Sequence, residues 1–111
     1  MTHERRRDVR IRVVLPAHLS FRERDEPVEI VEASFRGLLL KVHTPPVLNE
    51  LMKLRITIAN KVVTLYAVPV RETSHRGACA VGCKLFALGG FDKDEWQAFI
   101  AGLLRANVKA A

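Results

Sequence analysis

The sequence predicts a mostly β domain, either a small antiparallel barrel or a two-sheet sandwich, closed by one C-terminal helix. Six short segments alternate apolar and polar residues, which is the period of a half-buried strand. After the Gly-Gly pair at 89–90 the apolar spacing changes to that of a helix. A chain of 111 residues forms one domain. Many short strands with a single terminal helix favour a barrel or sandwich over an α/β arrangement.

The first third of the chain contains a charged arm and two predicted strands. Residues 1–8 are polar, with no period that could bury a face, and we expect a flexible arm. Over 9–21 the odd positions are apolar and most even positions are polar, which predicts a strand. Pro16 interrupts the polar face and predicts a bend, a bulge or an edge position. Residues 22–27 are charged and end in proline, which indicates a turn before a second strand begins at Val28.

The middle of the chain alternates tight turns with strands. Residues 32–37 read as a turn, and the apolar positions of 38–42 give the returning strand. Residues 43–49 contain Pro45-Pro46 and predict a loop, because proline cannot donate to a ladder. A fourth strand over 54–58 is expected to end in a turn at 59–61.

Two further strands and the helix complete the prediction. The fifth strand starts at Val63 and continues past Pro69 to Glu72, and 73–77 form the next turn. The sixth strand runs over 79–86, where Gly82 indicates a bulge or a close backbone approach.

The expected helix begins at Asp92, a good N-cap, and Glu95 lies three residues later as in a capping box. Its apolar stripe, which would cover an open end or face of the sheet, consists of Trp96, Phe99, Ile100, Leu103 and Leu104.

Composition narrows the possible partners and location. The net charge of +6 and the pI near 9.9 favour an anionic partner: a nucleotide, a nucleic acid, a membrane surface or an acidic protein. No apolar run approaches the roughly 20 residues of a membrane span, and the Arg-rich N-terminus lacks a signal-peptide core. We therefore expect no membrane insertion and a cytoplasmic location. Cys79 and Cys83, about 13 Å apart on one strand face, are too distant for a disulfide and read as small buried side chains.

Catalysis and metal binding find no support in the residue pattern. The four histidines are scattered and there is no Cys-x-x-Cys pair, so no metal site is expected. Ser34 has no sequence-local histidine and acid partner, and no phosphate-cradle motif occurs. The sequence therefore predicts a protein that is not an enzyme and that needs no cofactor.

Two short motifs carry the binding signal. The run Arg5-Arg6-Arg7-Asp8-Val9-Arg10 leads into the first strand, and its guanidinium groups could fork onto phosphate oxygens or stack on a base. The turn Glu32-Ala33-Ser34-Phe35-Arg36-Gly37 has a serine that can bond backbone and a glycine that allows close approach. Taken alone, the arginine run is explained as well by a solvated basic tail, and the turn by an ordinary hairpin.

Together these motifs resemble the PilZ domain, the family of bacterial cyclic di-GMP receptors. The family has an RxxxR motif near its N-terminus, matched by Arg6 and Arg10 with Arg5 in front, and a downstream (D/N)xSxxG, matched at Ser34 and Gly37. The segment Ala80-Val81-Gly82-Cys83-Lys84-Leu85-Phe86 is similar to the family's late strand, and the terminal helix also agrees. The resemblance thus spans nearly the whole chain, with residues 1–8 as the arm and 9–107 as the barrel domain with its helix.

The resemblance implies a six-stranded antiparallel barrel whose arm wraps cyclic di-GMP, usually as a stacked pair, against the outer surface. Arg6 and Arg10, with Arg5 in addition, would neutralise phosphates and meet guanine edges or faces. Ser34 and Glu32 would bond another guanine edge, and Gly37 would leave room for the ligand. Binding would order the arm and pass the signal to an unidentified protein partner.

Glu32 departs from the family, which has Asp or Asn there. The extra methylene displaces the carboxylate by more than an ångström, as about one C–C bond length implies. The family also contains adaptors that do not bind the nucleotide, so an adaptor acting through protein contacts in motility or pilus control is the alternative. A nucleic-acid-binding barrel is a third interpretation. The aromatic residues argue against it, because most fall at core positions and offer no stacking platform for bases.

Overall fold

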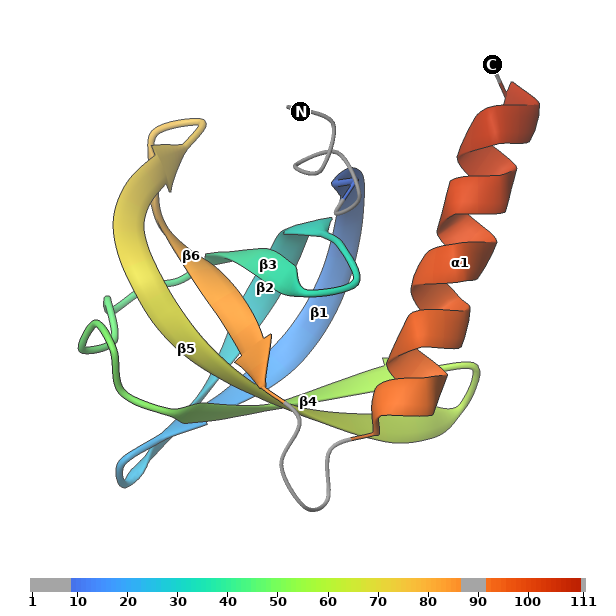
Figure 1. Ribbon diagram of the computed structural model, residues 1–111. Coiled ribbons are helices and arrows are strands. Elements are labelled where there is room, and N and C mark those ends of the chain that lie inside the picture. Colours follow the sequence, from blue (N-terminus) through green and yellow to red (C-terminus); the bar gives the residue numbers. More distant parts are fainter. Residues whose placement is uncertain (1–8, 87–91, 111) are drawn as a thin grey trace, which may run out of the picture.

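A computed structural model describes residues 9–86 and 92–110, with side chains of the helix as far as 106. Six antiparallel strands close into a barrel in the order β1-β2-β3-β6-β5-β4, and one helix, α1, follows (Figure 1). The elements are β1 Ile11–Phe21, β2 Arg24–Ala33, β3 Gly37–Lys41, β4 Met52–Ile58, β5 Lys61–His75, β6 Ala78–Phe86 and α1 Lys93–Ala110. The predicted strands and terminal helix are confirmed, and the barrel replaces the sandwich alternative. The predicted flexible arm, residues 1–8, lies outside the described residues.

The predicted turns were longer than the observed ones; those over 32–37 and 59–61 lose the end residues that belong to β2, β3 and β5. The turn predicted over 22–27 is wrong, because β2 begins at Arg24 and Pro27 lies within the ladder opposite His18. The turn predicted over 73–77 is wrong for the same reason, since β5 continues to His75. Both hairpins turn within two residues, and Arg22 (φ 58°), Arg76 (φ 52°) and Gly77 (φ 83°) adopt left-handed backbone angles. Arg24 and Asp25, whose charges suggested a loop, instead occupy exposed strand positions.

The irregular positions predicted from Pro16 and Gly82 coincide with register shifts. In β1 the pairing with β2 shifts between Arg12 and Leu15, just before Pro16. Strand β4 pairs with β1 only over Ala17–Ser20, so Pro16 lies outside that ladder. In β5 the register shifts between Pro69 and Arg71, which places Arg71 opposite Gly82.

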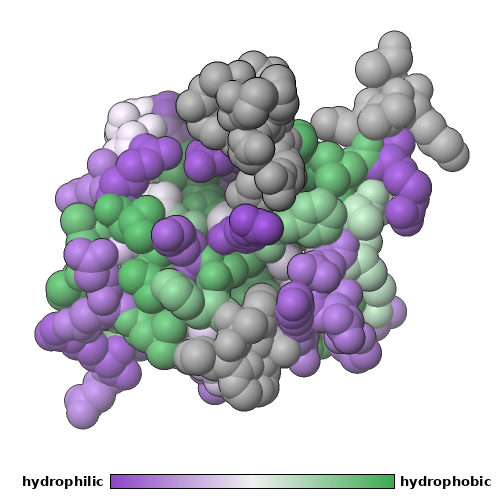
Figure 2. Space-filling model, viewed as in Figure 1, coloured by the Kyte–Doolittle hydropathy of each residue, from purple (hydrophilic) through white to green (hydrophobic). Residues whose placement is uncertain are grey.

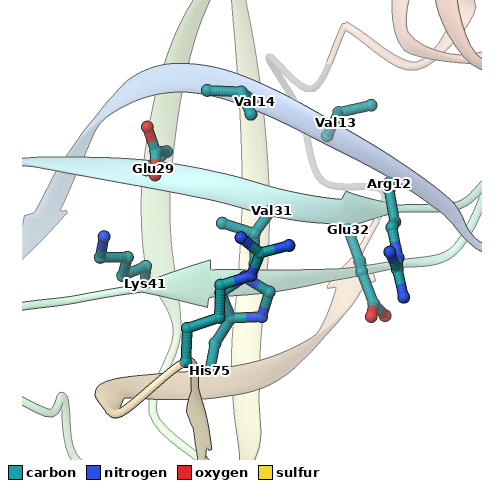
Figure 3. A pocket seen from close by; sticks show the side chains of 9 residues that line it. Arg12, Val13, Val14, Glu29, Val31, Glu32, Lys41 and His75 are labelled. Atoms are coloured by element: carbon teal, nitrogen blue, oxygen red, sulfur yellow. The ribbon is translucent and has the colours of Figure 1, made fainter.

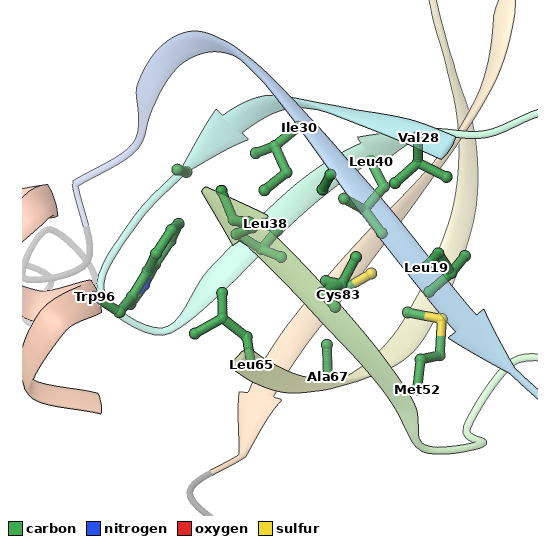
Figure 4. Close-up of a cluster of buried hydrophobic side chains, with 14 of the residues drawn as sticks. Leu19, Val28, Ile30, Leu38, Leu40, Met52, Leu65, Ala67, Cys83 and Trp96 are labelled. Atoms are coloured by element: carbon green, nitrogen blue, oxygen red, sulfur yellow. The ribbon is translucent and has the colours of Figure 1, made fainter. Parts of the chain in front are cut away.

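The barrel interior is filled by one apolar cluster to which all six strands and the helix contribute (Figure 4). Ile30, Leu40, Leu54 and Leu65 have no exposed surface. Burying an aliphatic side chain of this size contributes about 1.5–3 kcal/mol. Cys83 belongs to this cluster, and burial raises the pKa of its thiol to about 12.

Cys79, four residues earlier in the same strand, is only half-buried, which corrects the prediction that both cysteines are buried. Burial and a contact between Sγ and Oε2 of Glu72 at 3.6 Å raise its thiol pKa. Both thiols are free.

Helix α1 is attached to the barrel through its first turn. The Asp92 carbonyl accepts the first helical bond, from the Trp96 N–H, so Asp92 occupies the predicted N-cap position. Its carboxylate, however, accepts the N–H of Thr64 on β5 (2.8 Å), and Glu95 pairs with Lys61 (2.9 Å). The predicted capping box is therefore wrong, because both acidic side chains bind β5. The Trp96 ring points from the helix into the end of the barrel (Figure 4).

Candidate functional site

The turn between β2 and β3 is closed by Ser34 and Gly37. The Gly37 N–H donates to Ser34 Oγ (3.0 Å), the Ser34 hydroxyl donates to the Gly37 carbonyl (3.2 Å), and the Ser34 N–H donates to that same carbonyl (3.0 Å). Only 1% of Ser34 is exposed. The Ser-x-x-Gly spacing therefore produces a turn in which the serine hydroxyl is directed at its own backbone.

Two long-range bonds fix this turn to the rest of the fold. The indole N–H of Trp96 donates to the Ser34 carbonyl at 3.1 Å, across 62 residues of sequence. The Leu85 N–H of β6 donates to the Arg36 carbonyl at 2.8 Å. The turn is thus held from the helix on one side and from the barrel on the other.

Gly37 is required by a close approach to β6. A Cβ at this position would lie 3.0 Å from the Cys83 carbonyl oxygen, closer than almost any real contact of that kind. We predicted that Gly37 would leave room for a ligand. The structure gives another reason for the glycine, the close backbone of the neighbouring strand, and the role toward a ligand stays a prediction.

Arg10, at the entrance to β1, meets Glu32 on β2. Arg10 Nη1 lies 3.7 Å from Glu32 Oε1, and the two side chains are 62% and 31% exposed. Arg10, Glu32 and Gly37 line one crevice of about 10 Å³, which holds no more than one water molecule. The structure therefore brings three of the predicted site residues together at the outer surface of the barrel, with Ser34 buried in the turn beneath. Arg5 and Arg6 lie outside the described residues.

A larger cavity of about 740 Å³, which sequence reasoning missed, lies beside this crevice. Its size is in the range of small-molecule sites. Glu32 lines both spaces. Figure 3 shows Arg12 and Glu32 close together at one end and Glu29 and Lys41 toward the other. The lining residues are Arg12, Val13, Val14, Glu29, Val31, Glu32, Lys41, His75 and Arg76.

The cavity has a cationic rim and a partly apolar floor. Three permanent cations, Arg12, Lys41 and Arg76, face two carboxylates, Glu29 and Glu32. Val31 belongs to a small apolar cluster, with Leu39 and Ala80, that is separate from the barrel interior. An apolar floor with charged groups at the edge suits a flat aromatic ring bearing anionic substituents.

The surface of the domain is mixed in character. On the face shown in Figure 2, hydrophilic and hydrophobic residues are interspersed. No helix in the described part of the chain is long and apolar enough to cross a membrane. Within residues 9–86 and 92–110, no group of three or more His, Cys, Asp or Glu side chains could hold a metal ion.

The fold and this surface define a closed β-barrel domain with a polar cavity, lined by cations and carboxylates, on its outer face. The sequence model of the PilZ domain matches residues 4–102, and the chain therefore belongs to the PilZ domain family. None of the curated proteins matches the chain.

Thirteen chains among the solved structures match this chain, and two of them show how far the fold is shared. The Bacillus subtilis inhibitor of motility MotI/DgrA superposes with a TM-score of 0.78 at 15% identity, over 94% of this chain and 52% of that chain. This chain thus spans about half the length of that structure. The PilZ domain of CeSA from a cellulose-synthesizing bacterium superposes with a TM-score of 0.66 at 15% identity, over 85% of this chain and 96% of that chain.

Proposed function

We propose that the protein is a non-catalytic cytoplasmic receptor for cyclic di-GMP that passes the signal to a protein partner by ordering its N-terminal arm. The observation that carries the proposal is the meeting of Arg10, Glu32 and Gly37 at one crevice beside a cationic cavity. These residues belong to the two motifs by which PilZ receptors are recognised, and the family model matches residues 4–102.

The arginines supply the main attraction to the ligand. Arg10 stands at the junction of the arm and β1, so Arg5 and Arg6 precede the site directly in sequence. Guanidinium groups bind phosphate through paired hydrogen bonds and meet the O6 and N7 atoms of guanine in the same way. Binding would exchange the exposed Arg10–Glu32 contact, which contributes little at the surface, for charge-assisted contacts to the nucleotide.

Ser34 supports the site from within. Its predicted hydrogen bond to a guanine edge stays a prediction, and the role that its geometry supports is to hold the turn that joins β2 to β3. This turn also fixes the position of the Glu32 backbone relative to Gly37.

Glu32 sets the strength of binding. A glutamate that fails to make the base contact of the family's Asp or Asn loses a charge-assisted hydrogen bond, which costs about 1.5–3 kcal/mol. That loss corresponds to roughly ten- to a hundredfold in affinity. We therefore expect binding in the micromolar range, weaker than that of a receptor with Asp at this position.

Calorimetric titration with cyclic di-GMP at near-physiological salt tests the proposal. Arg10→Ala should weaken binding at least about tenfold, because a charge-assisted contact is lost. Arg105→Ala, on α1, removes the same charge from a residue that belongs to neither motif and lines neither the crevice nor the cavity, and it should bind like the parent. If Arg10→Ala kept the parent's affinity, the site assignment would be wrong.

An adaptor of the same fold that does not bind the nucleotide is the second candidate. The contact between Arg10 and Glu32 favours it, since these two motif residues already have each other as partners of opposite charge. One structural neighbour is an inhibitor of motility, and contact with a motility or pilus protein is the matching role here. Glu32→Asp discriminates the two: an adaptor parent would show no binding, and the variant would gain it.

A further inference from the structure

The cavity has a wall that neither motif supplies. His75 and Arg76 line it from the β5–β6 hairpin, opposite the β1–β2 side that carries Arg12 and Glu32. His75 pairs with Ala78, and Arg76 and Gly77 form the two-residue turn between them with positive φ angles. In Figure 3 the His75 side chain projects over the strands that carry Val31 and Lys41.

Arg71 lies on the same outward face of β5. It is opposite Gly82, and a Cβ on that glycine would lie 3.4 Å from both Cγ and Nε of Arg71. The arginine stem therefore lies flat across β6. A single Cβ at this distance would be in close van der Waals contact with the arginine, whereas a larger side chain would compete with it for the same space.

Cross-strand pairing connects Arg71 to the motif site in one row around the barrel. Arg12 pairs with Glu32, Glu32 with Leu39, Leu39 with Gly82, and Gly82 with Arg71. Four inter-strand steps of about 4.8 Å separate the ends of this row by about 19 Å along the surface. A span of that length suits a dinucleotide better than a single phosphate.

The charges on this face are available for a ligand. Among the described residues, Arg10, Arg22, Arg24 and Arg55 form ion pairs with carboxylates. Arg12, Arg71 and Arg76 form none within the described part of the chain, and two of them line the cavity. These three guanidinium groups lie on one outward face, and their charges raise the positive potential of that face.

We propose that the β5–β6 hairpin forms the second half of the nucleotide site, with Arg71 and Arg76 contacting the phosphates of an anionic dinucleotide and His75 lining the ring-binding surface between them. This inference rests on the proposed function and extends it to residues outside the two motifs. A cyclic dinucleotide carries two phosphodiesters, and the hairpin arginines would add to Arg12 on the β1 side, so that both sides of the site offer guanidinium groups to phosphate.

The test is titration of Arg71→Ala and Arg76→Ala with cyclic di-GMP, beside the parent, Arg10→Ala and the charge-matched control Arg105→Ala. Each hairpin variant should bind at least about tenfold more weakly, as expected for loss of a charge-assisted contact. Arg105→Ala should stay within twofold of the parent. Arg76→Lys should recover part of the affinity, because the charge returns without the planar fork.

The outcomes separate this inference from the function on which it rests. If the parent binds, Arg10→Ala binds weakly and both hairpin variants match the parent, the hairpin is no part of the site and only this inference fails. If the parent gives no heat, the receptor function fails and the inference with it. Circular dichroism verifies that each variant folds. If Arg71→Ala does not fold, the affinity of Arg76→Ala, which changes an exposed turn, decides whether the hairpin belongs to the site.

Discussion

Trp96 is predicted to fix the Ser34 turn, and its replacement by phenylalanine tests this link between α1 and the candidate site. The tryptophan is fully buried, and its indole N–H donates to the Ser34 carbonyl at 3.1 Å. Trp96→Phe removes the donor, which costs about 1–3 kcal/mol when the acceptor stays buried. The smaller ring leaves a void that adds to this loss, so the free energy of unfolding should fall by about 2–4 kcal/mol.

Urea denaturation followed by far-ultraviolet circular dichroism measures this change. Trp96 is the single tryptophan of the chain, so tryptophan fluorescence cannot follow the unfolding of the Trp96→Phe variant. Phe99→Leu is the matched control, because Phe99 packs beside Trp96 with ring centroids 5.8 Å apart but takes no part in that hydrogen bond. Phe99→Leu should lower the free energy of unfolding by less than about 1.5 kcal/mol.

The same variant should weaken cyclic di-GMP binding more than Phe99→Leu does, because the turn carrying Ser34 loses its tether. The reasoning would be refuted by a Trp96→Phe protein that loses under about 0.5 kcal/mol, within the range of ordinary surface substitutions, and keeps the parent's affinity. In the parent, the single tryptophan also provides a probe: its emission should change as ligand binds near the turn.

Three further predictions follow from buried or closely packed groups. Gly37→Ala places a Cβ 3.0 Å from the Cys83 carbonyl and should destabilise the fold by about 1–3 kcal/mol in urea melts. Asp92→Ala removes the acceptor for the Thr64 N–H and should cost about 1–3 kcal/mol, whereas Asp92→Asn should retain part of that stability. Burial raises the Cys83 thiol pKa from 9.0 to about 12, so above pH 9 the unfolded chain releases this proton while the folded chain keeps it. Stability should therefore fall as pH rises from 9 toward 12, and Cys83→Ala should flatten this part of the pH profile.

The strand pattern could be predicted from the sequence because a half-buried strand repeats every two residues. The alternation over 9–21 predicted a strand, and in the structure this strand, β1, begins at Ile11. The hairpin ends were harder, because charged residues occur both in turns and on the outward face of strands. Arg24 to Pro27 looked like a loop but belong to β2, whose outer face is solvated.

The site was predictable where its residues are adjacent in sequence, and not where the barrel brings them together. The Ser-x-x-Gly turn and the arginine before β1 are visible as short motifs, although Ser34 Oγ faces its own backbone. The cavity combines side chains from β1, β2, β3 and the β5–β6 hairpin, and no local spacing relates His75 to Glu32. The one available signal was Gly82, where a missing side chain indicated close approach and the structure places Arg71.

The most direct test of the receptor function is calorimetric titration of the chain with cyclic di-GMP, beside an Arg6→Ala/Arg10→Ala double variant. We predict micromolar or tighter binding by the parent and no measurable binding by the double variant. Absence of heat with the parent at high ligand concentration would contradict the receptor function and favour the adaptor.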